Sequence, residues 1–482
     1  MDKGKNMAVT IARKIENTLH EKFYFDPTPS QVSLLHASSR CVASDKEKCL
    51  LVVKGYAGTG KTTTVNALIK TLPLFNFKYV MLAPTGRAAK VMSAYTRKPA
   101  FTIHKKIYFK QKTANGGVFF ITGKNLHTNT VFIVDEASMI GAENYSYSGG
   151  GDLLTDLMEY VFSGKNCRLI LIGDGAQLPP VGSDYSPALD LKYLKSTFFL
   201  TAASTELIDV IRQSQDSGIL SLATSIREAI SSNNAEVFPL KLPSTQDLQS
   251  ITGNDLQEAL EDEFSKIGPE GAILITRSNK RANQYNKEIR VRVFFQEEDI
   301  SGGDYVMAVR NNYHWLDEKS QAGFIANGDV MEIVRLGKRF ERYSFSFQEA
   351  TVRLIDYPME PETEVLLWLD CLDIDGASMP KNATDEVYRR LMLDYADLPT
   401  KKERIEAIKK DPVYNALQIK FSYAVTCHKS QGGQWPAVFV DQGYLIEEMI
   451  DVEYMRWLYT AITRASQRLY LLNFTERIFI IE

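Results

Sequence analysis

A glycine-rich segment that ends in a lysine and a threonine has the residue types and the spacing to bind the phosphates of a nucleotide. Residues 55–62, GYAGTGKT, fit the pattern G-x-x-x-x-G-K-[ST] and follow an apolar run that predicts a strand. In such a loop the glycines let successive backbone N–H groups point at phosphate oxygens, and a helix that begins at Lys61 adds the positive end of its dipole. The Lys61 ammonium would reach the β- and γ-phosphates, and the Thr62 hydroxyl would ligate Mg²⁺. The spacing therefore predicts a site for ATP and Mg²⁺ at Gly55, Ala57, Gly58, Thr59, Gly60, Lys61, Thr62 and Thr63.

Two acidic residues end another candidate strand. In residues 132–136, FIVDE, an apolar run would deliver Asp135 and Glu136 to the edge of a parallel sheet where ligands bind. Asp135 suits the coordination shell of Mg²⁺, and Glu136 suits the activation of an attacking water. Alone, two carboxylates at a strand end could equally cap a helix. Downstream of a phosphate loop, the catalytic interpretation is favoured.

A glutamine follows a third candidate strand. Gln177 stands within residues 172–180, IGDGAQLPP, where two prolines stiffen the chain. Its uncharged amide could detect a γ-phosphate by hydrogen bonding. Read alone, the segment would be an ordinary loop.

These residues need parallel sheets to position them, and two regions of the chain show the required alternation of short apolar runs and helical patterns. The first region, from about 45 to 205, contains the expected strands Cys49–Val53, Tyr79–Ala83, Val131–Val134, Arg168–Ile172 and Thr197–Leu200. The second region is split into parts at about 206–295 and 418–482. It contains the expected strands Ala272–Thr276, Phe421–Thr426, Ala437–Val440 and Arg468–Leu472, and helices at Lys280–Val293 and Tyr454–Thr463.

A block at about 300–415 interrupts the second region. Its first half is strand-rich, with Asp304–Arg310, Val330–Val334 and Val365–Leu369. Its second half is a charged helical stretch, Asp385–Lys410, with proline breaks. We expect a small β-barrel with a helical extension, inserted into the second α/β domain. A shorter insertion at about 105–128 would form a hairpin that turns at Gly116-Gly117.

The composition is ordinary for a soluble protein of 482 residues, with 44% hydrophobic and 24% charged residues and a formal net charge of −3. This charge argues only weakly against nucleic acid, because a local basic groove is sufficient to bind a phosphate backbone. The five cysteines are an odd number without metal-ligand spacing, so we expect reduced thiols. The chain shows no apolar run of the length of a signal peptide or a membrane span, and we expect a cytoplasmic protein.

Seven segments together resemble the RecD/Pif-type branch of the superfamily 1 helicases. They are residues 55–62, 83–90 (APTGRAAK), 134–139 (VDEASM), 173–180 (GDGAQLPP), 210–213 (VIRQ), 425–432 (VTCHKSQG) and 459–465 (YTAITRA). The resemblance covers most of the chain, from about Thr28 to Leu472, and is weakest between about 335 and 415. It implies an α/β fold class: two RecA-like P-loop domains in tandem, with a β-hairpin insertion in the first and a β-barrel insertion in the second.

The pattern of strands and helices, read together with this resemblance, predicts the domain boundaries. An N-terminal helical segment would occupy residues 1–44, and the first RecA-like domain residues 45–205. The second RecA-like domain would comprise residues 206–299 and 416–482, on either side of the barrel and its helical extension at 300–415.

Further residues of the nucleotide site are implied by the family. Gln31 would read the adenine edge, because an amide can pair with both a donor and an acceptor. Arg212 and Arg464 would point from the second domain at the γ-phosphate, where a guanidinium suits the charge that develops on a transferring phosphoryl group. Gln431 and Gly432 would also contact the nucleotide. Outside these motifs, Gln31 would be a surface glutamine and each arginine a surface ion-pair partner.

DNA contacts are implied at the same motifs. Hydroxyls, imidazoles and lysines are typical phosphate contacts, and aromatic rings can stack on bases. The candidates are Thr85, Lys90, Thr102 and His104 in the first domain, Thr426, His428, Lys429 and Ser430 in the second, and Phe119 and Phe120 in the hairpin. The hairpin would act as a wedge that splits the duplex. Alternatively, the polar residues cap helices or support the ATP loops, and the hairpin packs on its own domain.

The function expected from these motifs is ATP-dependent translocation on single-stranded DNA and duplex unwinding. The 5′→3′ polarity comes from the resemblance alone. The expected partners are single-stranded and tailed duplex DNA, with no membrane, and the chain would act as a monomer or with other DNA-processing proteins. The alternatives are a DNA-stimulated ATPase that displaces proteins or drives a recombination complex, and an RNA helicase, although nothing in the sequence indicates recognition of a 2′-hydroxyl.

Overall fold

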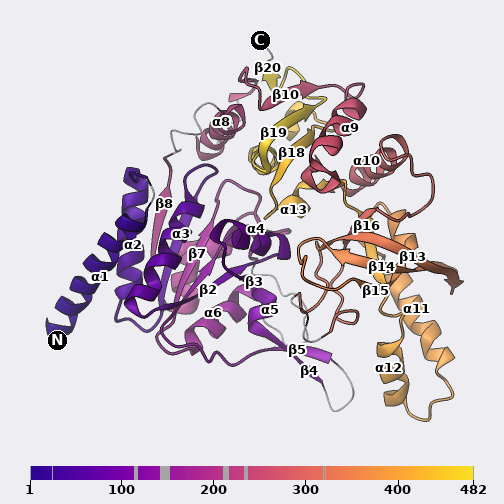
Figure 1. Cartoon of the computed structure of the whole chain (residues 1–482), viewed down its shortest axis with the longest axis horizontal. Helices are drawn as coiled ribbons and strands as arrows, with labels where there is room; N and C mark the ends of the chain where they lie inside the picture. Colours follow the sequence, from indigo (N-terminus) through magenta and orange to yellow (C-terminus); the bar gives the residue numbers. More distant parts are fainter. Residues whose placement is uncertain are drawn as a thin grey trace.

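Two parallel sheets and a closed barrel form the framework of the molecule (Figure 1). The computed structural model describes residues 2–23, 25–112, 118–141, 152–209, 217–232, 237–317, 320 and 322–480. Figure 1 shows the second sheet at the top, the first sheet with its helices at the lower left, and the barrel with its helical extension at the lower right. The expected α/β fold class, with two RecA-like domains and a barrel insertion, is confirmed.

The first sheet has the strand order β3-β2-β6-β7-β1-β8, and all its pairs are parallel. Its strands are β1 (Cys49–Gly55), β2 (Lys78–Ala83), β3 (Ala100–Thr102), β6 (Thr130–Val134), β7 (Arg168–Gly173) and β8 (Thr201–Leu207). Alternate side chains of β1 enter two different cores, because successive residues of a strand face opposite sides of a sheet.

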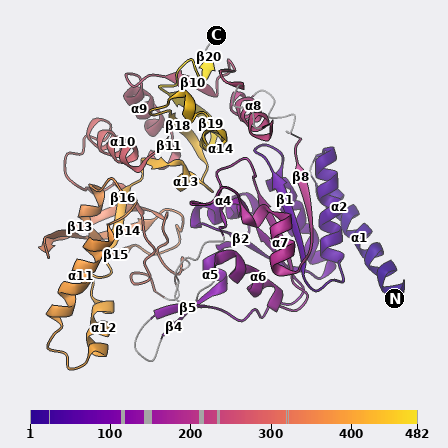
Figure 2. The same cartoon turned by 180° about the vertical axis from the view of Figure 1, so that it is seen from behind.

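Helices cover both faces of this sheet (Figure 2). On one face lie α1 (Asp2–Lys22), α2 (Pro29–Ala43), α3 (Lys61–Thr71) and α4 (Gly86–Thr96). On the other lie α5 (Ile103–Ile107), α6 (Leu153–Ser163) and α7 (Leu191–Phe198). Because all strands of the sheet are parallel, their carboxyl ends meet at one edge, where a ligand can approach.

The second sheet has the order β10-β19-β18-β11-β17 and is also parallel throughout. Its strands are β10 (Leu248–Ile251), β11 (Ala272–Thr276), β17 (Ala424–Thr426), β18 (Trp435–Asp441) and β19 (Ala465–Leu472). The helices α8 (Gly218–Ser232) and α14 (Val452–Ile462) pack on one face, and α9 (Leu256–Ile267) and α10 (Asn279–Arg292) on the other. The short helix α13 (Cys427–Ser430) follows β17, and β9 (Leu240–Lys241) pairs with β20 (Phe479–Ile480).

The inserted barrel closes in the order β12-β13-β14-β15-β16. Its strands are β12 (Tyr305–Ala308), β13 (Val330–Arg342), β14 (Phe345–Leu354), β15 (Thr363–Trp368) and β16 (Leu417–Phe421). Between β15 and β16 the chain leaves as the helices α11 (Lys381–Asp394) and α12 (Lys401–Lys410). Pro380 and Pro399 precede these helices, as the sequence predicts.

One expected strand, Thr197–Leu200, is wrong. The Asp190 side chain accepts hydrogen bonds from the backbone N–H groups of Lys192 and Tyr193, so α7 begins there and continues to Phe198. The strand follows as β8 at the edge of the sheet, where only Leu207 is buried. Because residues 201–207 contain no apolar run, the sequence pattern did not reveal them.

The expected strand Phe421–Thr426 is divided between two sheets. Residues up to Phe421 belong to the barrel strand β16, whereas β17 begins at Ala424 in the second parallel sheet. Asn286 holds the break, because its amide donates to the carbonyls of Phe421 (3.1 Å) and Ala424 (2.8 Å) and accepts from the Ala424 N–H (2.8 Å). The barrel therefore extends beyond the expected boundary at residue 415.

The hairpin insertion forms as expected. The strands β4 (Tyr108–Lys112) and β5 (Val118–Thr122) pair antiparallel, whereas the turn expected at Gly116-Gly117 lies outside the described residues. Within the described chain, no helix has both the length and the apolar character needed to cross a bilayer.

A buried ion pair links the second domain to the barrel. Asp304 accepts both Nε (2.8 Å) and Nη2 (2.9 Å) of Arg290, and these side chains are 2% and 6% exposed. We expect Asp304→Ala to lower the free energy of unfolding by about 3–5 kcal/mol, because it leaves a buried guanidinium without a carboxylate. The midpoint of urea unfolding, followed by tryptophan fluorescence, measures this.

The control is Asp299→Ala, which removes the exposed pair between Asp299 and Arg339. Such a pair contributes about 0–1 kcal/mol. Equal shifts in the two variants would contradict the structural role of the buried pair.

Candidate active site

The phosphate loop lies between β1 and α3, as the sequence predicts. Gly60 has a left-handed backbone, with φ 88°, and precedes the first residue of the helix. The Lys61 ammonium donates to the carbonyls of Gly55 (2.7 Å) and Tyr56 (2.9 Å), which holds it above the loop. A Cβ atom on Gly55 would lie 2.9 Å from Cγ of Lys61, so a glycine is required for this packing.

The two predicted acids follow β6 directly. The Asp135 carboxylate accepts from the Tyr95 hydroxyl (2.8 Å) and from the Glu136 N–H (2.9 Å). Glu136 has a left-handed backbone, with φ 52°, in the turn after the strand. Burial raises the pKa of the Glu136 carboxyl, and Asp135 raises it further, while the positive charges of Arg464 and Lys61 lower it. A carboxylate with a raised pKa has the properties of a general base.

Gln177 lies in the same cavity, on the segment after β7. Its side chain is 5% exposed, and its amide oxygen has no hydrogen-bond partner among the described residues. Because buried polar atoms are normally paired, this oxygen suits a ligand or a water that enters the cavity. Asp174, which the sequence did not single out, braces the segment by accepting from the Ala176 N–H (2.9 Å).

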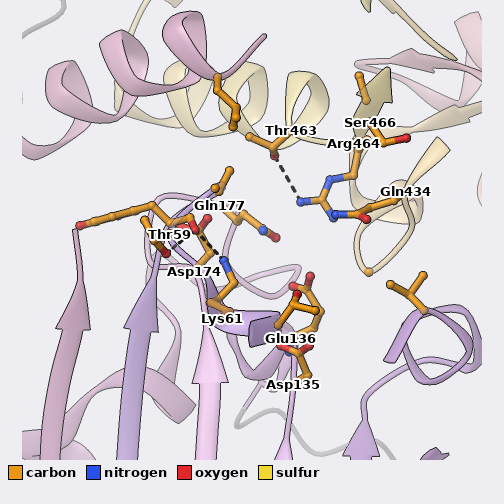
Figure 3. A pocket seen from close by; sticks show the side chains of 18 of the residues that line it. Thr59, Lys61, Asp135, Glu136, Asp174, Gln177, Gln434, Thr463, Arg464 and Ser466 are labelled. Atoms are coloured by element: carbon orange, nitrogen blue, oxygen red, sulfur yellow. Dashed lines mark hydrogen bonds between the residues drawn. The ribbon is translucent and has the colours of Figure 1, made fainter. Parts of the chain in front are cut away.

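The second domain supplies the opposite wall (Figure 3). Arg464 is 3% exposed and donates to the carbonyls of Thr460 (3.0 Å) and Gly433 (3.3 Å) and to the Thr463 hydroxyl (3.3 Å). No carboxylate lies within 4.0 Å of its guanidinium in the described part of the chain, so its charge remains available to an anion. Figure 3 shows Lys61 and Glu136 entering from one side and Arg464 from the other.

The cavity between these walls has a volume of about 510 Å³, within the range of small-molecule sites. Lys61, Thr62, Asp135, Glu136, Gln177, Gly432 and Arg464 line it. The predicted loop residues therefore meet both the predicted acids and one predicted arginine. Tyr56, Tyr95, Gln434 and Ser466 also line the cavity, although none of them was predicted as a site residue.

Gly432 and Gln431 lie where the two domains touch. Gly432 has a φ of 73°, and a Cβ there would lie 2.9 Å from Cβ of Ala88 and 3.1 Å from the Thr85 hydroxyl. The Gln431 amide donates to the Leu178 carbonyl (2.7 Å) in the first domain. Of these two residues, Gly432 lines the cavity and Gln431 does not; Gln431 instead links the two domains.

Gln31 is placed beside the phosphate loop but does not line the cavity. Its amide nitrogen donates to the Thr59 carbonyl (3.0 Å), and its amide oxygen accepts from the Thr28 N–H (2.9 Å). The side chain is 2% exposed. One amide hydrogen and one lone pair remain for a base, so adenine reading stays a prediction, whereas support of the loop is observed.

The oxygens of Thr62 and Asp135 fit a magnesium ion that is shared with phosphates. Both residues line the cavity. Within the described ranges no group of three or more His, Cys, Asp and Glu side chains could hold a metal alone. Mg²⁺ usually takes one or two protein oxygens together with substrate phosphates and water, and this donor set is of that kind.

Two of the four residues of the first domain that were predicted to contact DNA, Thr85 and Thr102, begin helices at the ends of neighbouring strands. The hydroxyl of Thr85 accepts from the Ala88 N–H (3.2 Å), and that of Thr102 accepts from the Lys105 N–H (3.2 Å), so both cap helices. The Lys90 ammonium donates to the Ile355 carbonyl of the barrel (2.8 Å). Burial lowers the pKa of His104 to about 4, so its imidazole is neutral at physiological pH.

The candidates of the second domain lie at the end of β17. Burial lowers the pKa of His428 and lowers that of Lys429 to about 8. Ser430 is 1% exposed and its hydroxyl donates to the Cys427 carbonyl (2.7 Å), so its contact with DNA stays a prediction that these two observations do not favour. Thr426 begins α13 without a side-chain cap, so its hydroxyl is not used there.

Three candidates cannot be placed in the site. Arg212 lies outside the described residues. Phe119 and Phe120 lie on β5, but their side chains are outside the described part of the structure. The wedge role of the hairpin therefore stays a prediction.

Two family models match the chain at these two walls. Residues 39–183 match an AAA domain, and residues 421–472 match a UvrD-like helicase C-terminal domain. The ATP-dependent DNA helicase dda of Enterobacteria phage T4 is 26% identical over 61% of this chain and 64% of its own length. An uncharacterized protein of Acanthamoeba polyphaga mimivirus is 25% identical over 86% of this chain and 93% of its own.

Through these matches the chain is similar to the RecD/Pif-type branch of the superfamily 1 helicases. A solved structure of a Pif1 helicase from Bacteroides, in complex with ADP-AlF3 and ssDNA, aligns over 95% of both chains at 15% identity, with a TM-score of 0.48. The similarity to this branch is carried by the two family models, the relatives and the ordered motifs of the chain.

The close contact between the domains at Gly432 predicts that a substitution there lowers the rate of ATP hydrolysis. Gly432→Ala would place a methyl group against Ala88 and Thr85 and so push the two domains apart. We expect ATP hydrolysis to fall about tenfold or more, because a displacement of about 1 Å in a catalytic site can cost that much. Steady-state hydrolysis rates and the unfolding midpoint are the measurements.

The matched control is Gly303→Ala in the barrel. Gly303 has a similar backbone, with φ 87°, but nothing lies within 4 Å of its Cβ position. It should show only the cost of the left-handed backbone, about 1–2 kcal/mol, with normal hydrolysis. If both variants hydrolysed ATP normally, the proposed close fit would be wrong.

Proposed function

We propose that this chain is an ATP-driven helicase that moves along single-stranded DNA in the 5′→3′ direction and separates duplexes. The supporting observation is the shared cavity, which Lys61 and Glu136 line from the first domain and Arg464 from the second. A nucleotide bound there would contact both domains, so that its binding favours closure and loss of the γ-phosphate permits reopening. The polarity rests on family resemblance alone.

The side chains divide the work of hydrolysis. The Glu136 carboxylate would accept a proton from the attacking water, and the unpaired amide oxygen of Gln177 would accept a hydrogen bond from that water. Lys61 and Arg464 would stabilise the negative charge that develops on the transferring phosphoryl group. Mg²⁺, held by Thr62 and Asp135, would supply charge neutralisation at the phosphates when bound.

DNA is the polymer that the comparisons favour. The phage relative is named as an ATP-dependent DNA helicase. In this chain, Thr85 and Thr102 begin helices at the ends of β2 and β3, and Thr426 begins one at the end of β17, where polar groups suit phosphate contacts. We propose single-stranded and tailed duplex DNA as partners and a monomer as the working form.

Hydrolysis rates with single-stranded DNA, with single-stranded RNA and without polymer test this proposal, together with unwinding of 5′-tailed and 3′-tailed duplexes. We expect stimulation by DNA and unwinding of the 5′-tailed substrate. Stimulation without strand separation would instead favour a motor that displaces proteins. Stimulation by RNA alone would replace DNA as the substrate.

Replacement of the proposed base predicts loss of chemistry with retention of binding. Glu136→Gln keeps the size of the side chain but removes its ability to accept a proton, so kcat should fall by about 10²–10⁴ while nucleotide binding persists. The control is Glu206→Gln: Glu206 does not itself line the cavity and accepts from the hydroxyl of Tyr56 (2.7 Å), so kcat should stay near that of the wild type. Normal turnover in Glu136→Gln would remove this glutamate from the mechanism.

The pH profile of hydrolysis should report the charge of Arg464. Activity requires the deprotonated Glu136 and is lost as the pH falls through its pKa, which the Arg464 charge lowers. Arg464→Gln should therefore move the acid limb to higher pH as well as reduce kcat, whereas Arg464→Lys should leave the limb near its wild-type position. An unchanged acid limb in Arg464→Gln would show that another group controls it.

A further inference from the structure

The helix α14 sends one tyrosine hydroxyl across the boundary between the two domains. Tyr459 is 1% exposed. Its hydroxyl accepts from the N–H of Ala57 in the phosphate loop (3.0 Å) and donates to Oδ2 of Asp174 after β7 (2.7 Å). One oxygen atom of the second domain thus forms hydrogen bonds with two segments of the first domain that line the nucleotide cavity, the phosphate loop and the segment after β7.

A phenol is suited to this position because its oxygen can accept and donate at the same time. Burial and the Asp174 carboxylate raise the pKa of Tyr459 well above its ordinary value, so the hydroxyl keeps its proton. If the hydroxyl were absent, a backbone N–H and a carboxylate oxygen would each lose a buried partner.

Hydrogen bonds continue from Tyr459 to the arginine of the cavity. The Thr463 hydroxyl donates to the Tyr459 carbonyl (2.8 Å) and accepts from Nη2 of Arg464 (3.3 Å). On the other side, Oδ1 of Asp174 accepts from Ala176, next to Gln177. The phosphate loop, the Gln177 segment and the Arg464 guanidinium are therefore connected through one residue.

We propose that Tyr459 is a positioning residue that couples the phosphate loop to the second domain, so that events at the nucleotide are linked to movement of that domain. This inference rests on the proposed helicase function. Tyr459 does not line the cavity, so it acts through Ala57, Asp174 and Arg464 rather than on the nucleotide.

The same helix offers a matched control. Tyr454 is 2% exposed, and its hydroxyl has no hydrogen-bond partner in the described ranges. Tyr454→Phe and Tyr459→Phe therefore remove the same atom from two buried rings on α14, but only Tyr459→Phe breaks a connection between domains.

The experiment compares these variants in the full chain. The readouts are kcat and KM for ATP with and without single-stranded DNA, and base pairs unwound per ATP hydrolysed. For Tyr459→Phe we expect DNA-stimulated kcat to fall about tenfold, as for the loss of a hydrogen bond to a charged group, with a smaller change in KM and fewer base pairs unwound per ATP. Tyr454→Phe should match the wild type.

A second variant keeps the inference testable if Tyr459→Phe folds poorly. Asp174→Asn retains an acceptor but removes its charge, and its effect should not add to that of Tyr459→Phe in a double-mutant cycle, because both act through one bond. Fully additive effects, or a Tyr459→Phe protein equal to Tyr454→Phe, would overturn the coupling role. Absence of DNA-stimulated hydrolysis in the wild type would instead overturn the proposed function.

Discussion

Buried backbone groups must find hydrogen-bond partners, and at the boundary between the two sheets the nucleotide segments of the first domain find theirs in the second. The Leu178 N–H donates to the Thr460 hydroxyl (2.8 Å), and the Leu178 carbonyl accepts from Gln431 (2.7 Å). The Ala57 N–H donates to Tyr459 (3.0 Å). Movement of one domain away from the other would therefore expose or orphan polar groups next to the catalytic residues, and this ties domain geometry to the state of the site.

The charges of the cavity depend on the same boundary. Arg464 is almost fully buried and bonded only to uncharged oxygens among the described residues, which is costly unless an anion shares the space. Its charge also lowers the pKa of Glu136, which burial raises. With Lys61 on the opposite wall, the cavity has two cations beside the carboxyl group of Glu136, and a polyphosphate is the ligand that such an arrangement accommodates.

The sequence predicts best the features that depend on local chain geometry. The phosphate loop, the acids after β6 and most of the buried parallel strands follow from short motifs and apolar runs, and they form as expected. The edge strand β8 and the barrel strand β14 were not predicted, and Phe421, the last residue of the barrel strand β16, was assigned to the second parallel sheet. Strands that are exposed or that close a barrel lack the continuous apolar run of a buried parallel strand.

Within the site, the sequence could not predict contacts between distant segments. Tyr459 belongs to the motif at residues 459–465, yet its partners Ala57 and Asp174 lie far from it along the chain. The hydrogen bond from the Gln31 amide to the Thr59 carbonyl could not be predicted for the same reason. A motif indicates which residues belong together, whereas the hydrogen bonds that a side chain makes are set by tertiary packing.

The barrel adds a third participant at the face where the first domain is expected to meet DNA. The Lys90 ammonium lies 3.5 Å from the Asp356 carboxylate, whose side chain is 3% exposed. A Cβ on Gly86 would lie 2.8 Å from both an Asp329 oxygen and the Tyr357 hydroxyl, so the start of α4 is in close contact with the barrel. A phosphate that approached Lys90 would share that lysine with a buried carboxylate of like charge. Contact of Lys90 with a DNA backbone would therefore be linked energetically to the position of the barrel, as hydrolysis would be linked to the position of the second domain in the proposed mechanism.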